Sequence, residues 1–308
     1  MEEPTVSIDQ GLILLNKAIG ISSHAAVLNA RRGLGVRKVG HTGTLDPFAT
    51  GLLLLLVGSF TRLNELFHAL PKSYHATLEL GRETNTDDLT GETVAESQAW
   101  QTLNQNDVTS VFAGKIGPGL QRPSTFSAKR IKGERAYTLA LRGESVDLEP
   151  RSVLFHDLEV TSMEGPKVKF KARVSTGTYI RALTRDVGRD LGCGAHLTEL
   201  HRTKIGPFFI EDAVPSVERQ ILSGSKRATR RGSEVLPWLP TRELDVHERK
   251  AISQGRAIEQ GEVIPATWEH GGSEVNFAGF VALTHECELL GVAESGEFGL
   301  QPRKVFLA

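Results

Sequence analysis

Apolar and polar side chains alternate along the first two thirds of the chain in a way that predicts several strands. Residues 12–15 and 52–56 are short continuous apolar runs, which are typical of buried strands. Residues 74–80 alternate apolar and polar side chains, as a half-buried strand does, and residues 153–163 and 168–174 repeat this alternation. The chain is therefore expected to build a sheet from paired strands.

Between these strands the apolar spacing changes to that of helices. Ser22 or Ser23 can cap a helix that a following glycine ends. Residues 61–70 and the region near 98–112 also have the helical pattern. The segment 179–191 predicts a further helix, with an arginine at every fourth position. Strands and helices mixed in this way predict an α+β fold.

Changes of composition divide the chain into parts. Residues 117–150 begin with Gly-Pro-Gly and are strongly basic, so they are expected to form an inserted subdomain. Residues 223–234 are predicted to be a polar, basic linker. The acidic region beyond it has expected strands and glycine turns, which predicts a small β-rich domain over residues 236–308. The main domain is then 11–235, and residues 1–10 are expected to be disordered.

The composition is that of a soluble globular protein with a sizeable core. Of the 308 residues, 39% are hydrophobic and 24% are charged. No apolar run approaches the ~20 residues that a membrane-spanning helix needs, and the acidic N-terminus does not resemble a signal peptide. The two cysteines, Cys193 and Cys287, exclude a disulfide framework and a cysteine-based zinc site. These features predict a cytoplasmic protein.

The net charge of −1 hides an uneven distribution. Residues 243–308 contain 11 acids and 5 bases, a local net charge of −6, so residues 1–242 carry +5. Within the positive part, the segment from Lys115 to Arg142 holds seven bases against one acid, Glu134. Such a run is either a solvated face or a surface that follows nucleic-acid phosphates, and composition does not decide between them.

One loop stands out as a candidate site. Residues 38–50 read KVGHTGTLDPFAT and place Asp46 between a glycine-threonine turn and Pro47. An Asp-Pro pair restricts the aspartate to extended or turn geometry, and the glycines give the backbone freedom. The carboxylate is either a turn cap or a catalytic acid held on a loop. The residues alone leave these two interpretations at even odds.

Several other side chains are candidates for chemistry. Arg181 begins a helix after a Gly-Thr turn and can pair with a carboxylate, unless it belongs to a row of solvated arginines. Tyr74 and Tyr179 are two of only three tyrosines, and each either stacks on a planar ligand or transfers a proton, or is a tyrosine at the rim of the core. His41 can act as a base or as a stacking plate, and Lys17 is either a buried counter-ion or simply a lysine at the end of a strand. No second loop carboxylate of the kind that glycosidases use is evident.

These segments together resemble the TruB family of tRNA pseudouridine synthases, the stand-alone bacterial enzymes that isomerise a uridine in the T loop. The resemblance extends over nearly all of the chain. It is carried by five motifs in the expected order, which are LLNKAIGISS (14–23), KVGHTGTLDPFATG (38–51), KSYHATLELG (72–81), STGTYIRALTRDVG (175–188) and LGCGAHLTELHRTKIGPF (191–208). The probability that five motifs match in this order by chance is very small.

The resemblance implies roles for individual residues. Asp46 corresponds to the catalytic aspartate, which acts as nucleophile or charge stabiliser when the N-glycosidic bond breaks. Tyr74 corresponds to the tyrosine that stacks on the base and abstracts a proton, and Arg181 to the arginine that pairs with the aspartate. The family's histidine at position 41 fills the space that the flipped uridine leaves. The substrate-binding positions implied are His41, Tyr74, Tyr179, Leu200 and Lys17.

The resemblance also implies the architecture and the partner. The expected core is a mixed or antiparallel sheet, with the basic insertion gripping RNA and residues 236–308 forming a PUA-like domain. The expected partner is the T arm of tRNA, bound by a monomer without guide RNA, protein partner, cofactor or metal. Residues expected to contact RNA are Lys129, Arg130, Lys132 and Arg135.

The chain departs from the family pattern at three positions. Ala18 and Ser124 stand where the family usually has proline, and Phe126 stands where it usually has tyrosine. None of these is one of the three catalytic positions. Two rival interpretations remain open, a non-catalytic RNA-binding or RNA-folding protein that retains the fold, and a nucleoside hydrolase.

Overall fold

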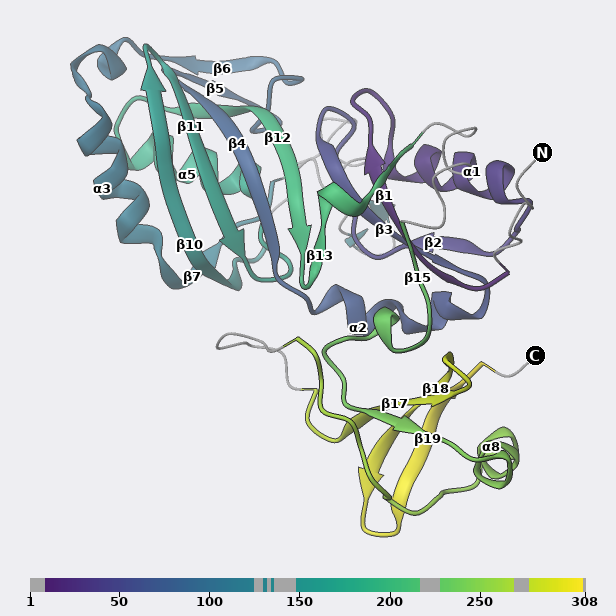
Figure 1. The fold of residues 1–308 in the computed structure, drawn as a ribbon. Coiled ribbons are helices and arrows are strands. Elements are labelled where there is room, and N and C mark those ends of the chain that lie inside the picture. Colours follow the sequence, from purple (N-terminus) through teal and green to yellow (C-terminus); the bar gives the residue numbers. More distant parts are fainter. Residues whose placement is uncertain are drawn as a thin grey trace. The chain divides into compact units, whose positions relative to one another are not determined.

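The computed structural model divides the chain into two compact units, residues 1–70 with 206–308 and residues 71–205 (Figure 1). Residues 1–8, which are expected to be disordered, and residues 223–227, the first part of the predicted linker, lie outside the described residues. No helix in the described part of the chain is long and apolar enough to cross a membrane. The structure describes residues 9–124, 130–131, 134–135, 148–216, 228–268 and 277–306.

The first unit is built on two apolar strands that the sequence predicts. Strands β1 (Gly11–Lys17) and β3 (Thr50–Val57) pair antiparallel, with Leu14 opposite Leu54. Both apolar runs are buried over their whole length, which confirms the prediction for residues 12–15 and 52–56. Three short strands extend this pair, namely β2 (Val39–His41) beside β3, and β14 (Val214–Pro215) and β15 (Thr229–Arg230) beside β1.

The first helix of this unit begins and ends as the sequence predicts. The hydroxyl of Ser22 accepts a hydrogen bond from the backbone N–H of Ala25 at 3.1 Å and caps α1 (Ser23–Leu34). Gly35, with φ of 68°, ends it in the left-handed conformation that glycine adopts without strain. The helix predicted for residues 61–70 is instead a 3-10 turn, η1 (Gly58–Leu63), followed by a short α2 (Asn64–His68).

The C-terminal region contains the predicted small β-rich part. Its four strands lie in the order β16-β17-β18-β19, and α8 packs against β19. Leu244, Ile252, Val281, Leu283 and Leu300 contribute to its core. The bounds of these elements are β16 (Thr241–Glu243), α8 (Val246–Ser253), β17 (Phe280–His285), β18 (Glu288–Gly296) and β19 (Gly299–Val305). Three short elements precede them in the chain, namely β13 (Phe208–Phe209), η3 (Ile210–Asp212) and η4 (Gly232–Val235).

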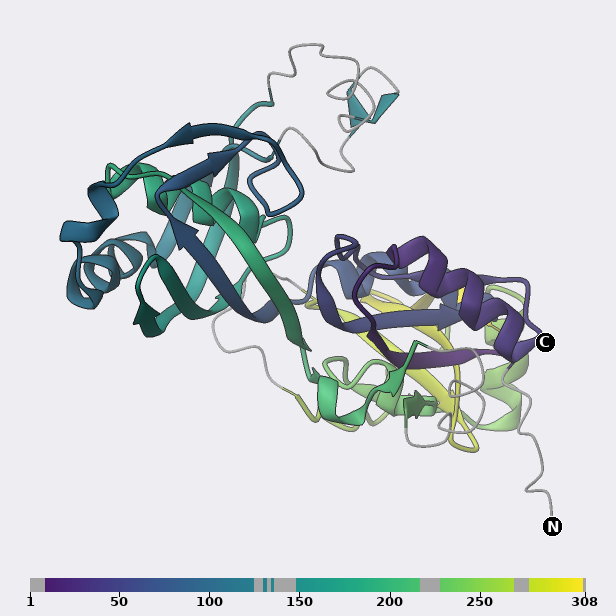
Figure 2. The same ribbon diagram turned by 90° about the horizontal axis from the view of Figure 1, so that it is seen from above.

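The second unit is an antiparallel sheet in the order β12-β4-β11-β10-β7. Helices α3 and α5 pack against the sheet and contact each other, as the view from above shows (Figure 2). Phe112 of α3 meets Phe170 of β11 with ring centroids 4.9 Å apart. The bounds are β4 (Lys72–Leu80), α3 (Gln105–Lys115), β7 (Gly117–Gln121), β10 (Arg151–Glu164), β11 (Lys167–Val174), α5 (Ile180–Asp190) and β12 (Ala195–Ile205).

The connection from β4 to α3 carries a short hairpin, β5 (Arg82–Thr84) with β6 (Thr93–Glu96), and a 3-10 turn, η2 (Ala99–Thr102). The single helix predicted near 98–112 is therefore divided. Asn104 explains the division, because its side chain caps α3 and forms a reciprocal capping box with Asp107. The mixed sheets with few helices confirm the α+β class.

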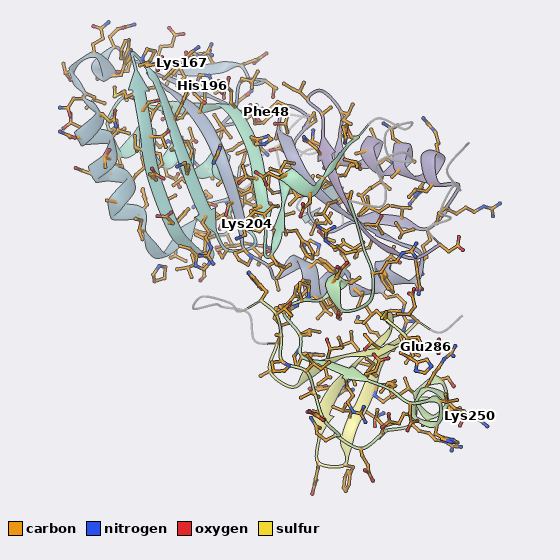
Figure 3. The ribbon with its side chains drawn as sticks, in the orientation of Figure 1. Phe48, Lys167, His196, Lys204, Lys250 and Glu286 are labelled. Atoms are coloured by element: carbon orange, nitrogen blue, oxygen red, sulfur yellow. The ribbon has the colours of Figure 1, made fainter. Side chains whose placement is uncertain are left out.

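A buried histidine shows how closely the second unit is packed. His196 lies on β12 (Figure 3) and is fully buried. Its Nδ1 lies 3.1 Å from the carbonyl oxygen of Arg82, and its Nε2 lies 2.9 Å from the guanidinium of the same residue. Because a carbonyl only accepts, Nδ1 carries the proton and Nε2 accepts. Burial lowers the pKa of His196, which agrees with a neutral ring.

Candidate active site

The loop that carries Asp46 is held by hydrogen bonds on both sides of the aspartate. The hydroxyl of Ser23 accepts a hydrogen bond from the N–H of Leu45 at 2.8 Å and donates to the carbonyl of Leu45 at 3.0 Å. On the other side, the N–H of Gly20 donates to the carbonyl of Pro47 at 2.8 Å. Asp46 itself is half-buried. A carboxylate between two fixed residues is held in one place, as a catalytic acid on a loop must be.

Lys17, at the end of β1, braces the same loop from within. Its side chain is fully buried, and its ammonium donates to the carbonyls of Ala18 at 2.9 Å, Ile21 at 2.8 Å and Pro47 at 3.4 Å. A buried ammonium is tolerated only when such groups replace its water. The contact with Pro47 reaches the Asp46 loop, and the other two hold the turn that follows β1. The implied role of Lys17 in substrate binding stays a prediction.

The turn after Lys17 contains the first departure from the family pattern. The backbone N–H of Ala18 donates to the hydroxyl of Ser216 at 3.0 Å. A proline at this position has no N–H and would lose this bond. Ala18 therefore does not leave the turn unsupported, because a hydrogen bond replaces the restriction that proline imposes.

His41 ends β2, directly before the Asp46 loop. It is half-buried and lies opposite Leu55 of β3 in the ladder, and the next residue, Thr42, donates its N–H to the carbonyl of Leu54 at 3.1 Å. The imidazole is thus mounted on the sheet and not on a free loop. Its role beside a flipped base stays a prediction.

In the second unit, Tyr74 and Leu200 share the sheet face on which the helices pack. Tyr74 lies opposite Ala172 on β11 and Arg202 on β12, while Leu200 lies opposite Ala76, two residues further along β4. Residues two apart on a strand face the same way, so these side chains are neighbours. Tyr74 and Leu200 are each 8% exposed. Both implied substrate contacts therefore come from one face.

Arg181, in the first turn of α5, is buried and held by several acceptors. Its Nη1 donates to the carbonyl of Thr86 at 2.9 Å, to a carboxylate oxygen of Asp88 at 3.2 Å and to the hydroxyl of Ser124 at 3.4 Å. Only 5% of the residue is exposed. This excludes the interpretation of Arg181 as part of a solvated row. Ser124, the second departure, contributes one of these contacts.

A second buried ion pair lies beside the first, one helical turn along. Arg185 donates through Nη1 to Asp87 at 3.1 Å and through Nε and Nη2 to Asp186 at 2.9 and 2.8 Å. Burial raises the pKa of the Asp87 carboxyl, and the neighbouring arginines oppose this effect. The loop that supplies the aspartates is tied to β12, because the N–H of Leu197 donates to the carbonyl of Asp87 at 3.0 Å.

Tyr179 occupies the residue before α5. Its backbone is bound by the side chain of Gln121, whose Oε1 accepts from the N–H of Tyr179 at 2.8 Å and whose Nε2 donates to its carbonyl at 3.1 Å. The phenol side chain is half-buried. Tyr179 and Arg181 are therefore brought together at the start of one helix.

The predicted RNA-contacting residues are described only in part. Lys129 and Lys132 lie outside the described residues, as does the third departure, Phe126. The backbones of Arg130 and Arg135 pair opposite each other in a two-residue hairpin, β8 (Arg130–Ile131) with β9 (Glu134–Arg135). Their contact with RNA stays a prediction.

Sequence reasoning missed Asp87, Asp88 and Gln121. The signal for the aspartates was present, because two adjacent acids lie in a Thr- and Gly-rich loop and two arginines stand four residues apart at 181 and 185. Gln121 gave no signal. Within the described part of the chain, no group of three or more His, Cys, Asp or Glu side chains is placed to hold a metal ion.

Solved structures identify the class of fold. A chain of the archaeal box H/ACA sRNP Nop10-Cbf5 complex superposes with a TM-score of 0.71 and 22% identity, over 99% of this chain and 89% of that chain. A chain of an H/ACA RNP bound to a substrate RNA containing 2'-deoxyuridine gives a TM-score of 0.72 and 21% identity, over 100% and 92% of the two chains. The fold is that of a pseudouridine synthase.

Sequence comparison identifies the family. Residues 31–180 match the N-terminal domain of the TruB family pseudouridylate synthases, and residues 181–225 match the tRNA pseudouridylate synthase B C-terminal domain. The tRNA pseudouridine synthase B of Aromatoleum aromaticum is 36% identical over 97% of this chain and 93% of its own. That of Aquifex aeolicus is 34% identical over 96% and 99%. The chain belongs to the TruB family of pseudouridylate synthases, as the five motifs led us to expect.

Proposed function

We propose that this chain isomerises the T-loop uridine of tRNA to pseudouridine. The observation that carries the proposal is the braced loop of Asp46, in which Ser23 and Lys17 fix the residues on either side of the aspartate. The relatives named tRNA pseudouridine synthase B, which align over nearly the whole chain, support tRNA as the substrate.

Asp46 acts on the sugar in this proposal. Isomerisation breaks the bond between C1′ and N1, turns the uracil and joins C1′ to C5. The proton on C5 is then lost and N1 gains one, so the atoms balance without a cofactor or an added reactant. An ionised carboxylate traps or stabilises the electron-poor C1′ while the base is detached. A loop suits this task, because the uridine must leave its stack to be reached.

Tyr74 acts on the uracil base and Arg181 on the charge of the Asp46 carboxylate. The ring of Tyr74 stacks on the uracil while it turns, and its oxygen takes the C5 proton as the hydroxyl passes its own proton to solvent. Arg181 pairs with the carboxylate of Asp46 and keeps it ionised, since an opposite charge favours the charged form. Tyr179, Leu200 and His41 complete the base-binding surface, with His41 filling the space in the tRNA that the uridine leaves.

The partner is the T arm of tRNA, and the basic insertion, residues 117–150, follows its phosphates. We propose that the chain works in the cytoplasm as a monomer without guide RNA, because the insertion resembles that of the stand-alone enzymes. The PUA-like assignment of residues 236–308 also stays a proposal. Their net charge of −6 favours few phosphate contacts there.

Incubation with unmodified tRNA, followed by chemical mapping of pseudouridine, tests the proposal. Pseudouridine at the T-loop uridine is the expected result. Release of free uracil would show a nucleoside hydrolase instead. Tight tRNA binding without any modified base would show a non-catalytic RNA-binding protein. A tRNA whose T-loop uridine is replaced by cytidine is the matched control and should remain unmodified.

A further inference from the structure

The segment 121–124, at the end of β7 and just after it, contacts α5 and the residue before it at three points. Gln121 binds the backbone of Tyr179 through both ends of its amide, at 2.8 and 3.1 Å. Arg122 accepts at its carbonyl from Nη2 of Arg185 at 2.9 Å. The hydroxyl of Ser124 accepts from Arg181 at 3.4 Å. Three of the four residues at positions 121–124 thus reach α5 or the residue before it, and α5 carries the proposed catalytic arginine.

Among these contacts, that of Gln121 satisfies the backbone N–H of the residue before α5. Tyr179 is the residue that precedes α5, and its own side chain makes no capping hydrogen bond. The first N–H groups of a helix need external partners. Gln121 is 2% exposed and supplies an acceptor for the N–H of Tyr179. Its amide orientation follows from its two partners, because an N–H can pair only with the amide oxygen and a carbonyl only with the amide NH₂ group.

The two ends of Arg181 are held separately. Its guanidinium is fixed by Thr86 and Asp88, at 2.9 and 3.2 Å. Its backbone lies two residues after Tyr179, so its position depends on where the helix begins. An arginine side chain has several rotatable bonds. If the start of the helix shifted, the backbone of Arg181 would move and its guanidinium would be displaced from its place in the site. Gln121 fixes this second end.

We propose that Gln121 is a positioning residue of the active site, which fixes Tyr179 directly and Arg181 through the start of α5. The proposal rests on the proposed function for the identity of the reaction, but the contact itself does not. The first strand of the basic insertion, which ends at Gln121, is thereby joined to the groups proposed to act on the uridine.

Amide hydrogen exchange without RNA tests the contact. Gln121→Met keeps the length of the side chain and removes its amide, so exchange at residues 179–183 should accelerate about tenfold, the effect of losing one to two hydrogen bonds. Gln121→Glu retains an acceptor and should show a smaller effect. Gln101→Met, the same change at an exposed glutamine of η2, should leave these amides unchanged. Unchanged exchange in Gln121→Met would refute the role of Gln121, whatever the activity.

Single-turnover kinetics with unmodified tRNA test the consequence. Gln121→Met should lower the rate at saturating enzyme about tenfold or more while the Kd for tRNA changes less than about twofold. Combined with Arg181→Lys, its effect should be smaller than in the wild-type background, because both changes misplace the same group. Fully multiplicative losses, or a loss confined to Kd, would overturn the proposal. A wild-type chain that forms no pseudouridine would refute only the proposed function.

Discussion

The buried contact between Asp88 and Arg181 predicts that Asp88→Asn slows catalysis strongly and affects tRNA binding little. One carboxylate oxygen of Asp88 accepts from Thr86 Oγ1, Thr90 N and Thr90 Oγ1, at 2.8, 2.9 and 2.6 Å. The other accepts from Arg181 at 3.2 Å. Asparagine can keep its oxygen toward the three local donors. Its NH₂ group must then face the guanidinium, so a donor meets a donor.

The magnitude follows from the bond that is lost. A hydrogen bond to a charged partner contributes about 1.5–3 kcal/mol. Asp88 and Arg181 are 3% and 5% exposed, so water cannot readily replace the carboxylate. The carbonyl of Thr86 still accepts from the guanidinium at 2.9 Å, and it retains part of the orientation. We therefore expect the rate of the chemical step to fall about 10- to 100-fold, with a loss of about 2 kcal/mol in the free energy of unfolding.

Tritium release provides the assay. The C5 proton of the target uridine is lost during isomerisation, so tRNA labelled with tritium at C5 reports the chemical step when enzyme is in excess. Kd for the same tRNA is measured by filter binding. Asp157→Asn is the matched control, since Asp157 lies exposed on β10. A wild-type rate in Asp88→Asn, or a defect confined to Kd, would show that Asp88 does not orient Arg181 for the reaction.

Three further predictions follow. Asp46→Asn should abolish pseudouridine formation and largely preserve tRNA binding; full turnover would refute its catalytic role. Charge reversal at Lys129, Arg130 and Lys132 together should weaken tRNA binding and flatten its salt dependence, and an unchanged salt slope would indicate a solvated face. Burial, together with a nearby arginine, lowers the pKa of Lys72 to about 7, against 10.5 ordinarily. Between these values the unfolded chain binds more protons, so wild-type stability gains with rising pH. Lys72→Met should therefore raise the free energy of unfolding by a few kcal/mol below pH 7 and by less as the pH approaches 10.5. Urea unfolding at both pH values measures this difference. An equal gain in the free energy of unfolding at both pH values would contradict the prediction.

The sequence predicted the elements that depend on local patterns. The apolar runs of β1 and β3, the serine cap of α1 and the alternating strand β4 all follow from spacing and short-range chemistry. The 3-10 turn η1 did not follow, because its apolar spacing fits an α-helix equally well. The division at Asn104 was also missed, although Asn104 and Asp107 form a capping pair that can be read from the sequence.

The candidate site was predictable only as a set of separate residues. Asp46 could be singled out because Pro47 and the glycines restrict its loop, and the ordered motifs supplied its expected partners. Whether Arg181 was solvated or buried could not be decided locally. Its partner Asp88 lies 93 positions away, and Arg185 meets Asp87 across 98 positions. Only the fold, which ties the aspartate loop to β12, brings these charges together.

The departures at Ala18 and Ser124 show how two proline positions can be occupied without loss of support. Proline would restrict the backbone of each segment and leave no N–H. In this chain the N–H of Ala18 bonds to Ser216, and the hydroxyl of Ser124 donates to Thr86 and accepts from Arg181. The restriction is therefore replaced by hydrogen bonds to neighbouring segments. At Ser124 the replacement adds an acceptor for Arg181 itself, so the residue that departs from the family pattern supports one of the residues that define it.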